Sequence, residues 1–179
     1  WTALGLSAGF RGIEWAQESP KKINRAPVQL EKGQPPVSVP MAFVRGDFVF
    51  LDTHKCPLHG ADRAKAAFVM IRWRTQKNNV NGQKMLFARA KTAFLCPVRA
   101  ALRIVWRGER IAHPVGLLGV SSEGPIVKAA AYVHIRAAAA RVFGYSTKKE
   151  LERFTLHSIR IGACVLLHEM GKSATFIKD

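Results

Sequence analysis

The dipeptide Asn81-Gly82 lies between two apolar runs, and it constrains the fold more than any other feature of this sequence. An Asn-Gly pair readily adopts the left-handed backbone of a tight turn, so the flanking runs are expected to pair as antiparallel strands. We predict strands at 68–73 and 84–88 on either side of this turn, and another strand at 48–51. The sequence therefore predicts a β-hairpin here.

Most of the remaining sequence has helical periodicity. We predict helices at 97–112, 127–143, 148–153 and 157–170, and the start of another helix at 173–178. Residues 1–17 should form either a buried helix pair or one helix with a glycine break. Two of these helices carry apolar stripes that should be buried, namely Val98, Ala101, Leu102, Val105 and Trp106 in one and Ile159, Ala163, Leu166 and Met170 in the other. The expected fold class is mainly α with a small three-stranded antiparallel β-sheet (α+β).

A length of 179 residues suits a single domain with a substantial core. Segment 18–40 contains five prolines and is expected to be a Pro-rich loop within that domain. The chain opens at Trp1 inside an apolar run and stops abruptly at Asp179, so we expect a domain that is incomplete at both ends.

The charge balance points to a polyanionic partner. Lysine and arginine total 28 against 12 acidic residues, which gives a net charge of +16 and favours nucleic acid as the partner. Arginines recur along one face of the 97–112 helix, either as a solvated face or as a DNA-binding surface: Arg99, Arg103, Arg107 and Arg110. No apolar run is long enough to cross a membrane, so no membrane partner is expected.

No cofactor is expected from the sequence. His54, Cys56 and His59 could offer three zinc ligands, but no fourth ligand follows at a familiar spacing. We therefore expect a polar loop and no metal site at 54–59.

A metal-free reaction at a phosphodiester needs fixed cations against the phosphate oxygens and an acid for the leaving oxygen. His157 and Arg160 lie three positions apart on a predicted helix, so both side chains can reach one phosphate. Arg11, far upstream, and Lys77, at the mouth of the predicted hairpin, complete a candidate set. Arg11 could instead be a surface arginine paired with Glu14.

Three segments carry a resemblance to a known family. Gly9-Phe10-Arg11-Gly12-Ile13-Glu14 is similar to the first box of the tyrosine recombinases (the phage integrase family). Arg72-Trp73-Arg74-Thr75-Gln76-Lys77 resembles the hairpin that carries the family's lysine, and Leu156-His157-Ser158-Ile159-Arg160-Ile161-Gly162-Ala163 resembles its H-x-x-R box. The sequences of the lysine hairpin and of the H-x-x-R helix are most similar to those of integrase-like proteins of eukaryotic mobile elements. The same holds for Leu95-Cys96-Pro97-Val98-Arg99-Ala100-Ala101.

The resemblance implies site-specific DNA breaking and rejoining through a 3′-phosphotyrosyl intermediate, without metal or ATP, by a homo-tetramer on double-stranded DNA. Arg11 and Arg160 would clamp the scissile phosphate, His157 would support it, and Lys77 would protonate the leaving 5′ oxygen. Glu14 would orient Arg11. For a eukaryotic mobile element the location would be the nucleus, and otherwise the cytoplasm with the DNA.

The family's tyrosine nucleophile follows the H-x-x-R box, whereas Tyr132 and Tyr145 both precede it. We therefore expect this chain to be truncated before its nucleophile and to bind DNA without cleaving it. Lys84 remains a rival to Lys77, and His168 is expected to be structural. The alternatives are a type IB topoisomerase-like enzyme and a non-catalytic DNA-binding remnant.

Overall fold

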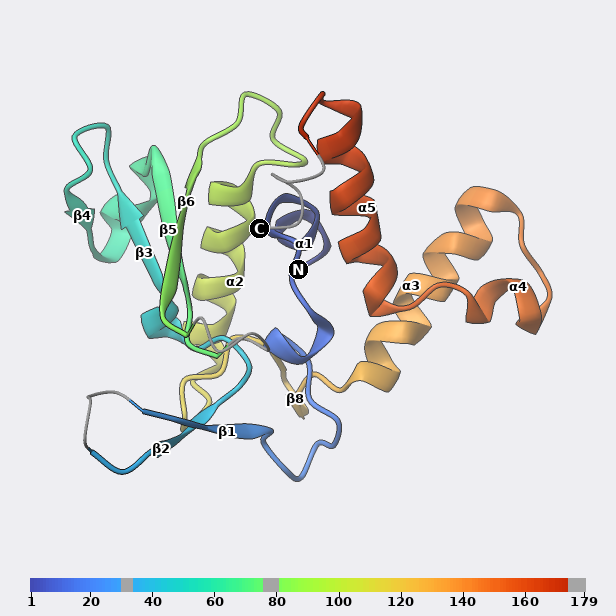
Figure 1. Ribbon diagram of the computed structural model, residues 1–179, viewed down its shortest axis with the longest axis horizontal. Helices are drawn as coiled ribbons and strands as arrows, with labels where there is room; N and C mark the ends of the chain where they lie inside the picture. Colours follow the sequence, from blue (N-terminus) through green and yellow to red (C-terminus); the bar gives the residue numbers. More distant parts are fainter. Residues whose placement is uncertain (30–33, 76–80, 174–179) are drawn as a thin grey trace.

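The computed structural model describes residues 1–29, 34–75 and 81–173. Within these residues the chain forms five α-helices, three 3-10 helices and three antiparallel sheets of two, four and two strands (Figure 1). The expectation of a mainly α fold with a three-stranded sheet is therefore wrong, because the architecture is mixed α/β.

The elements follow one another in chain order. They are α1 (Thr2–Ala8), η1 (Gly12–Glu14), β1 (Arg25–Val28), β2 (Val37–Pro40), η2 (Arg45–Asp47), β3 (Phe48–Leu51), β4 (Pro57–Leu58), η3 (Gly60–Lys65), β5 (Phe68–Trp73), β6 (Gln83–Ala88), α2 (Pro97–Ile111), β7 (Val120–Ser121), β8 (Gly124–Pro125), α3 (Lys128–Phe143), α4 (Lys148–Glu152) and α5 (Leu156–Glu169).

The four-stranded sheet has the order β4-β3-β5-β6, and α2 packs on one of its faces. Its β5–β6 hairpin pairs from Phe68 opposite Ala88 to Trp73 opposite Gln83, and Gly82 has a φ of 82° at the turn. The three strands predicted from the sequence are confirmed, and Gly82 directly precedes β6. The sheet gains a fourth strand, β4, from a segment that we expected to be loop.

Short strands that contain proline account for the wrong fold class. Pro27, Pro40, Pro57 and Pro125 lie in β1, β2, β4 and β8. Proline cannot donate to a strand ladder, so its presence argues against a strand in a sequence-based reading. Nevertheless β1 and β2 pair with each other, from Arg25 opposite Pro40 to Val28 opposite Val37, so segment 18–40 is more than a loop.

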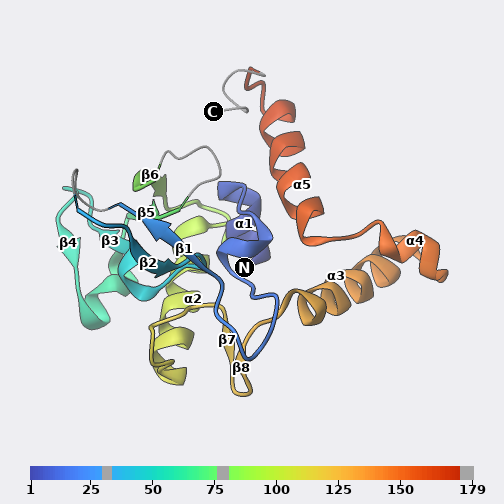
Figure 2. The ribbon, with the colours of Figure 1, turned by 60° about the horizontal axis from the view of Figure 1, so that its bottom comes forward.

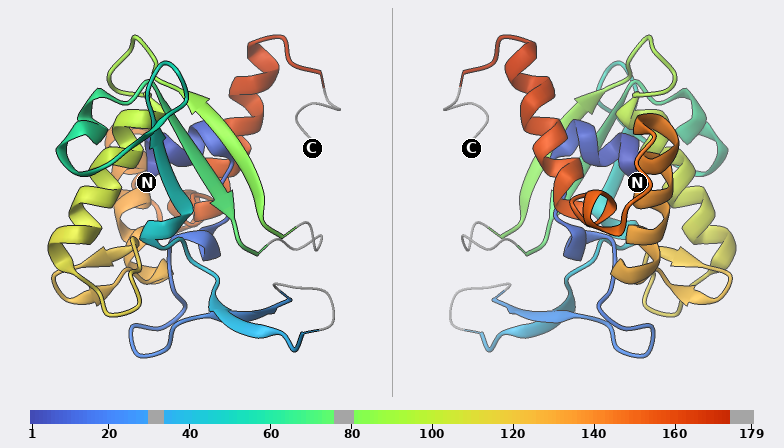
Figure 3. Two further views of the ribbon diagram at one scale, coloured as in Figure 1. Left: turned by 90° about the vertical axis from the view of Figure 1, so that its left-hand side faces the viewer. Right: turned by 90° about the vertical axis from the view of Figure 1, so that its right-hand side faces the viewer.

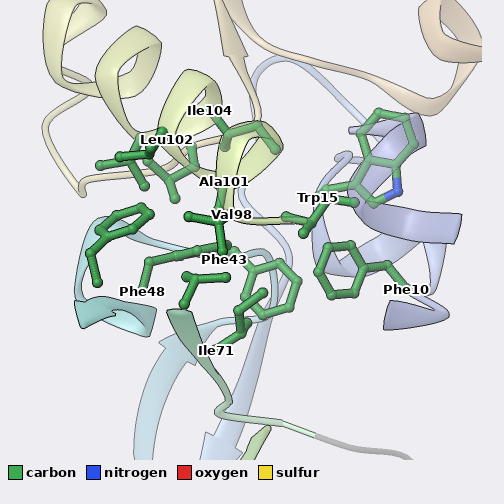
Figure 4. Close-up of a cluster of buried hydrophobic side chains, with 14 of the residues drawn as sticks. Phe10, Trp15, Phe43, Phe48, Ile71, Val98, Ala101, Leu102 and Ile104 are labelled. Atoms are coloured by element: carbon green, nitrogen blue, oxygen red, sulfur yellow. The ribbon is translucent and has the colours of Figure 1, made fainter. Parts of the chain in front are cut away.

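The core lies between the sheet, α1 and α2, and it is rich in aromatic rings (Figure 4). The ring of Phe10 lies 4.8 Å from that of Phe43 and 5.6 Å from that of Trp73, measured between centroids. From α2, Val98 and Ala101 fill the space above these rings. Phe10 directly precedes Arg11, so the burial of this ring fixes the start of the first candidate motif.

The helices α3 and α4 extend away from the sheet, and α5 returns to pack along α1 (Figures 1 and 2). Figure 3 shows the β1–β2 hairpin below the four-stranded sheet, on the opposite side of the molecule from the free end of α5. The predicted helices at 97–112, 127–143, 148–153 and 157–170 are confirmed within one or two residues. Most of segment 173–178 lies outside the described residues.

Candidate functional site

Arg11 occupies a fixed turn between α1 and η1. Gly9 ends α1 with a φ of 63°, a left-handed conformation that glycine adopts without a steric penalty. The Arg11 amide then donates a hydrogen bond of 2.8 Å to Oε2 of Glu14, and the Glu14 amide donates one of 3.0 Å back to the Arg11 carbonyl oxygen. This reciprocal pair holds the Arg11 backbone, while its side chain is only half-buried.

Glu14 is a buried carboxylate at the meeting point of three segments. Desolvation by burial raises the pKa of Glu14 above its ordinary value. The Arg11 amide and guanidinium, the Trp73 side chain as hydrogen-bond donor and the charge of Arg160 all oppose this shift. η1, the end of β5 and the first turns of α5 therefore converge on one carboxylate.

Close packing against glycines docks α5 in this position. A Cβ added to Gly12 would lie 2.8 Å from Cδ1 of Leu156, and one added to Gly5 would lie 2.8 Å from Cγ2 of Ile159. Leu156 and Ile159 are both buried. Side chains at these glycines would press on Leu156 and Ile159, so the two glycines allow the H-x-x-R motif to lie next to η1.

The H-x-x-R motif starts one residue inside α5. The Thr155 amide donates a 3.0 Å hydrogen bond to Oγ of Ser158, which caps the helix. With Leu156 and Ile159 turned into the core, Arg160 is half-buried near Glu14 and His157 is exposed. The arrangement places a guanidinium and an imidazole on the accessible side of the same helical turn.

Lys77 lies outside the described residues, but the stem of its hairpin is described. The Gly82 amide donates a 2.6 Å hydrogen bond to the carbonyl oxygen of Trp73. The Trp73 side chain acts as a hydrogen-bond donor toward the Glu14 carboxylate and lowers its pKa. The stem thus ends beside the Arg11–Glu14 turn. Lys84, the rival lysine, is exposed on β6 directly opposite Arg72.

A buried ion pair braces this hairpin, and we did not predict it from the sequence. The Asp47 side chain is 0% exposed and accepts hydrogen bonds of 2.8 and 2.9 Å from Nε of Arg74. Arg74 also donates to the carbonyl oxygen of Ala42 at 2.6 Å, and the Val44 amide donates to Asp47 at 2.8 Å. Burial raises the pKa of Asp47, against the opposing charge of Arg74. No periodic signal marks such a pair, because Asp47 ends η2 and Arg74 directly follows β5.

The structure does not bring the predicted arginine face to this site. Arg99, Arg103, Arg107 and Arg110 are all exposed on α2. α1 lies between α2 and α5, so it separates the helix that carries these arginines from the helix that carries the H-x-x-R motif (Figure 1). Trp106, expected in the buried stripe of α2, is 42% exposed.

Both tyrosines of the chain are half-buried and contact neighbouring side chains through their rings. Tyr132 packs against the core, with the Arg136 guanidinium 5.5 Å from its ring centroid. Tyr145 lies against the rings of Phe143 and Phe154, at centroid distances of 5.5 and 5.8 Å. Their environments are those of packed aromatic residues.

Among the described residues, no cluster of three or more His, Cys, Asp or Glu side chains could hold a metal ion. In the same part of the chain, every helix is too short or too polar to cross a lipid bilayer.

Comparison of the chain with family models found no match. No curated protein matches it. No solved structure matches it either. The functional inference therefore rests on the side chains gathered around Glu14.

Proposed function

We propose that this chain carries the phosphate-binding part of a DNA breaking-and-rejoining enzyme of the tyrosine recombinase type. The observation that supports this most directly is the close packing of Leu156 on Gly12 and Ile159 on Gly5, which brings the first turns of α5 next to the Arg11–Glu14 turn. In agreement with this packing, the charges of Arg11 and Arg160 both lower the pKa of Glu14. These arginines come from opposite ends of the chain, so only the tertiary fold can bring them together. Two guanidinium groups held near each other can bind the two non-bridging oxygens of one phosphodiester.

In this proposal, Arg11 and Arg160 clamp the scissile phosphate and His157 donates a further hydrogen bond to it. Lys77 protonates the leaving 5′ oxygen from the hairpin that follows Trp73. Glu14 stays buried and holds the Arg11 backbone, which makes it a positioning residue. No metal is required, because the guanidinium groups supply the positive charge that the transition state needs.

Duplex DNA is the proposed ligand of this 179-residue chain, which we expect to bind without cleaving. Tyr132 and Tyr145 are engaged in packing, so the nucleophile would have to come from elsewhere in the enzyme. Incubation with a nicked suicide duplex should give no covalent protein–DNA adduct. Detection of an adduct would show that one of these tyrosines reaches the phosphate.

Binding of the chain to a 30-base-pair duplex, followed by fluorescence anisotropy over a range of salt concentrations, tests the clamp. R11A and R160A should each weaken binding by about tenfold. Each should also reduce the slope of log affinity against log salt by about 0.9, the value for one lost phosphate contact. R141A, which removes an exposed arginine from α3, is the matched control and should change neither quantity.

Unchanged affinity in both R11A and R160A would contradict the proposed clamp. Catalysis is separated from binding in a protein that contains this chain together with a tyrosine nucleophile. There R160A should abolish cleavage while it only modestly reduces affinity. Equal loss of cleavage and of binding would favour a DNA-binding protein without catalytic chemistry.

A further inference from the structure

The outer face of α2 combines exposed arginines with an exposed tryptophan. Arg99, Arg103, Trp106 and Arg110 follow at spacings of four, three and four residues, which places them in one row along the helix. The opposite side of α2 is buried against the sheet and α1 through Val98, Ala101, Leu102, Ile104, Val105 and Gly108. We call this row, together with Arg107, the α2 arginine face.

The charge of the α2 arginine face is not balanced from within the described part of the chain. Glu109 is the only acidic residue of α2, and both its oxygens accept hydrogen bonds of 2.9 Å from Arg63. Arg45 approaches Glu109 as well, at 3.7 Å. The nearest carboxylate in the sequence is thus already paired on another side of the helix, and the arginines of the face make no ion pair among the described residues.

Aromatic surface accompanies these charges. Trp106 is 42% exposed between Arg103 and Arg110, and Phe94, in the loop before α2, is 83% exposed. Phe94, Arg103 and Arg107 line a surface hollow of about 210 Å³. An indole and a phenyl ring left in water cost hydrophobic free energy, which a stacked partner would recover.

We propose that the α2 arginine face, together with Phe94, binds single-stranded nucleic acid. Arginine guanidinium groups pair with backbone phosphates, and exposed aromatic rings stack on unpaired bases. A duplex would use the arginines alone, because its bases are stacked on one another and offer no face to Trp106. The row from Arg99 to Arg110 extends over about 16 Å of helix, enough for several phosphates of one strand.

This binding face is separate from the site around Glu14 and does not depend on the function proposed for it. α1 and the aromatic core lie between the two (Figures 1 and 4). A strand bound on α2 would therefore leave Arg11 and Arg160 accessible to a duplex. The two activities should respond to different substitutions.

Fluorescence anisotropy of the 179-residue chain with labelled dT20, and in parallel with a 30-base-pair duplex, tests the proposal. R103Q/R107Q should weaken dT20 binding by about tenfold and reduce the salt slope by about 1.4, since each phosphate contact to a single strand contributes about 0.7. W106A should weaken it by about fivefold or more through lost stacking. Thermal unfolding of each variant verifies that it is folded.

The matched control is R141Q/R153Q, which removes two exposed arginines from α3 and the end of α4. This variant should bind dT20 like the parent chain. The duplex affinity of R103Q/R107Q should equal that of R141Q/R153Q, since neither pair lies beside Glu14. Quenching of tryptophan fluorescence by dT20 should be strong in the parent chain and much weaker in W106F.

Three results would overturn the proposal. The first is equal loss of dT20 binding in R103Q/R107Q and R141Q/R153Q, which would indicate attraction by net charge alone. The second is unchanged dT20 affinity in W106A, which would remove the stacking role. The third is equal loss of duplex and single-strand binding in R103Q/R107Q, which would make the face a general DNA-backbone surface.

Discussion

The charge of Arg160 on α5 lowers the pKa of Glu14 in η1, against the effect of burial. These two residues show that the fold brings the first and last candidate motifs of the chain close together. Glu14 also accepts a 2.8 Å hydrogen bond from the Arg11 amide. The turn at Arg11, the end of β5 at Trp73 and α5 at Arg160 therefore all influence one carboxyl group.

The stability of the Glu14→Gln variant, compared with that of the parent chain, should increase as the pH rises. Desolvation raises the folded-state pKa of Glu14 above the ordinary value of 4.5, so this carboxyl ionises first in the unfolded chain. Below pH 4.5 both states hold the proton and the difference between E14Q and the parent should be constant. Above pH 4.5 the parent chain loses stability relative to E14Q. The side-chain amide oxygen of E14Q can still accept the hydrogen bond from the Arg11 backbone amide. Thermal unfolding midpoints at pH 4, 5, 6 and 7 measure this difference.

Glu150→Gln provides the control with the opposite sign. Glu150 holds the same kind of capping position in α4, but it is exposed, and hydrogen bonds from Thr147 lower its pKa. E150Q should therefore lose stability relative to the parent as the pH rises through the region of the Glu150 pKa. The same trend in E14Q and E150Q would contradict the assigned role of burial at Glu14.

Asp47→Asn should lower the free energy of unfolding by about 3 kcal/mol, because it leaves the Arg74 guanidinium buried without its counter-charge. Asp47 is fully buried and its bonds to Arg74 are 2.8 and 2.9 Å long. Urea unfolding measures the loss. E109Q, which breaks the more exposed pair with Arg63, should cost only about 1 kcal/mol. A D47N variant no less stable than E109Q would show that Asp47 is not the main support of Arg74.

Gly119→Ala should destabilise the chain by about 3 kcal/mol through overpacking. A Cβ at this position would lie 1.8 Å from the carbonyl oxygen of Trp15, and backbone atoms cannot move aside as the end of a side chain can. Trp15 follows Glu14, so G119A should also weaken duplex binding. Gly46→Ala is the control, because a Cβ there meets nothing within 4 Å, and it should change stability by less than about 0.5 kcal/mol. Equal stability of G119A and G46A would disprove this close contact.

Much of the secondary structure could be read from the sequence. Apolar alternation and the Asn81-Gly82 turn located β3, β5 and β6, and helical periodicity with Pro97 and Gly144 located α2 and α3. We did not predict the strands that contain proline. Each has only two to four residues and lacks one backbone hydrogen-bond donor, so it shows no detectable alternation of apolar residues. Their omission produced the wrong fold class.

Burial within the helices was only partly predictable. Leu166 and Met170 continue the apolar spacing of Ile159 and Ala163, yet they are 40% and 65% exposed, because α1 covers only the first half of α5. Trp106 directly follows the buried Val105, and the 100° rotation per residue turns its ring outward beside the arginines. The sequence shows which residues are apolar but not how far the neighbouring element extends.

The sequence by itself determined the local turns and helices that hold each candidate residue, since these depend on neighbours within a few positions. Only the tertiary structure decided that Arg11, Trp73 and Arg160 all influence the pKa of Glu14 while α2 lies on the other side of α1. The physical reason is that side chains distant in sequence meet through packing, here of Leu156 and Ile159 over two glycines. Such contacts depend on how the side chains of distant segments fit together in the core, and the periodicity of residues along the chain does not predict that fit.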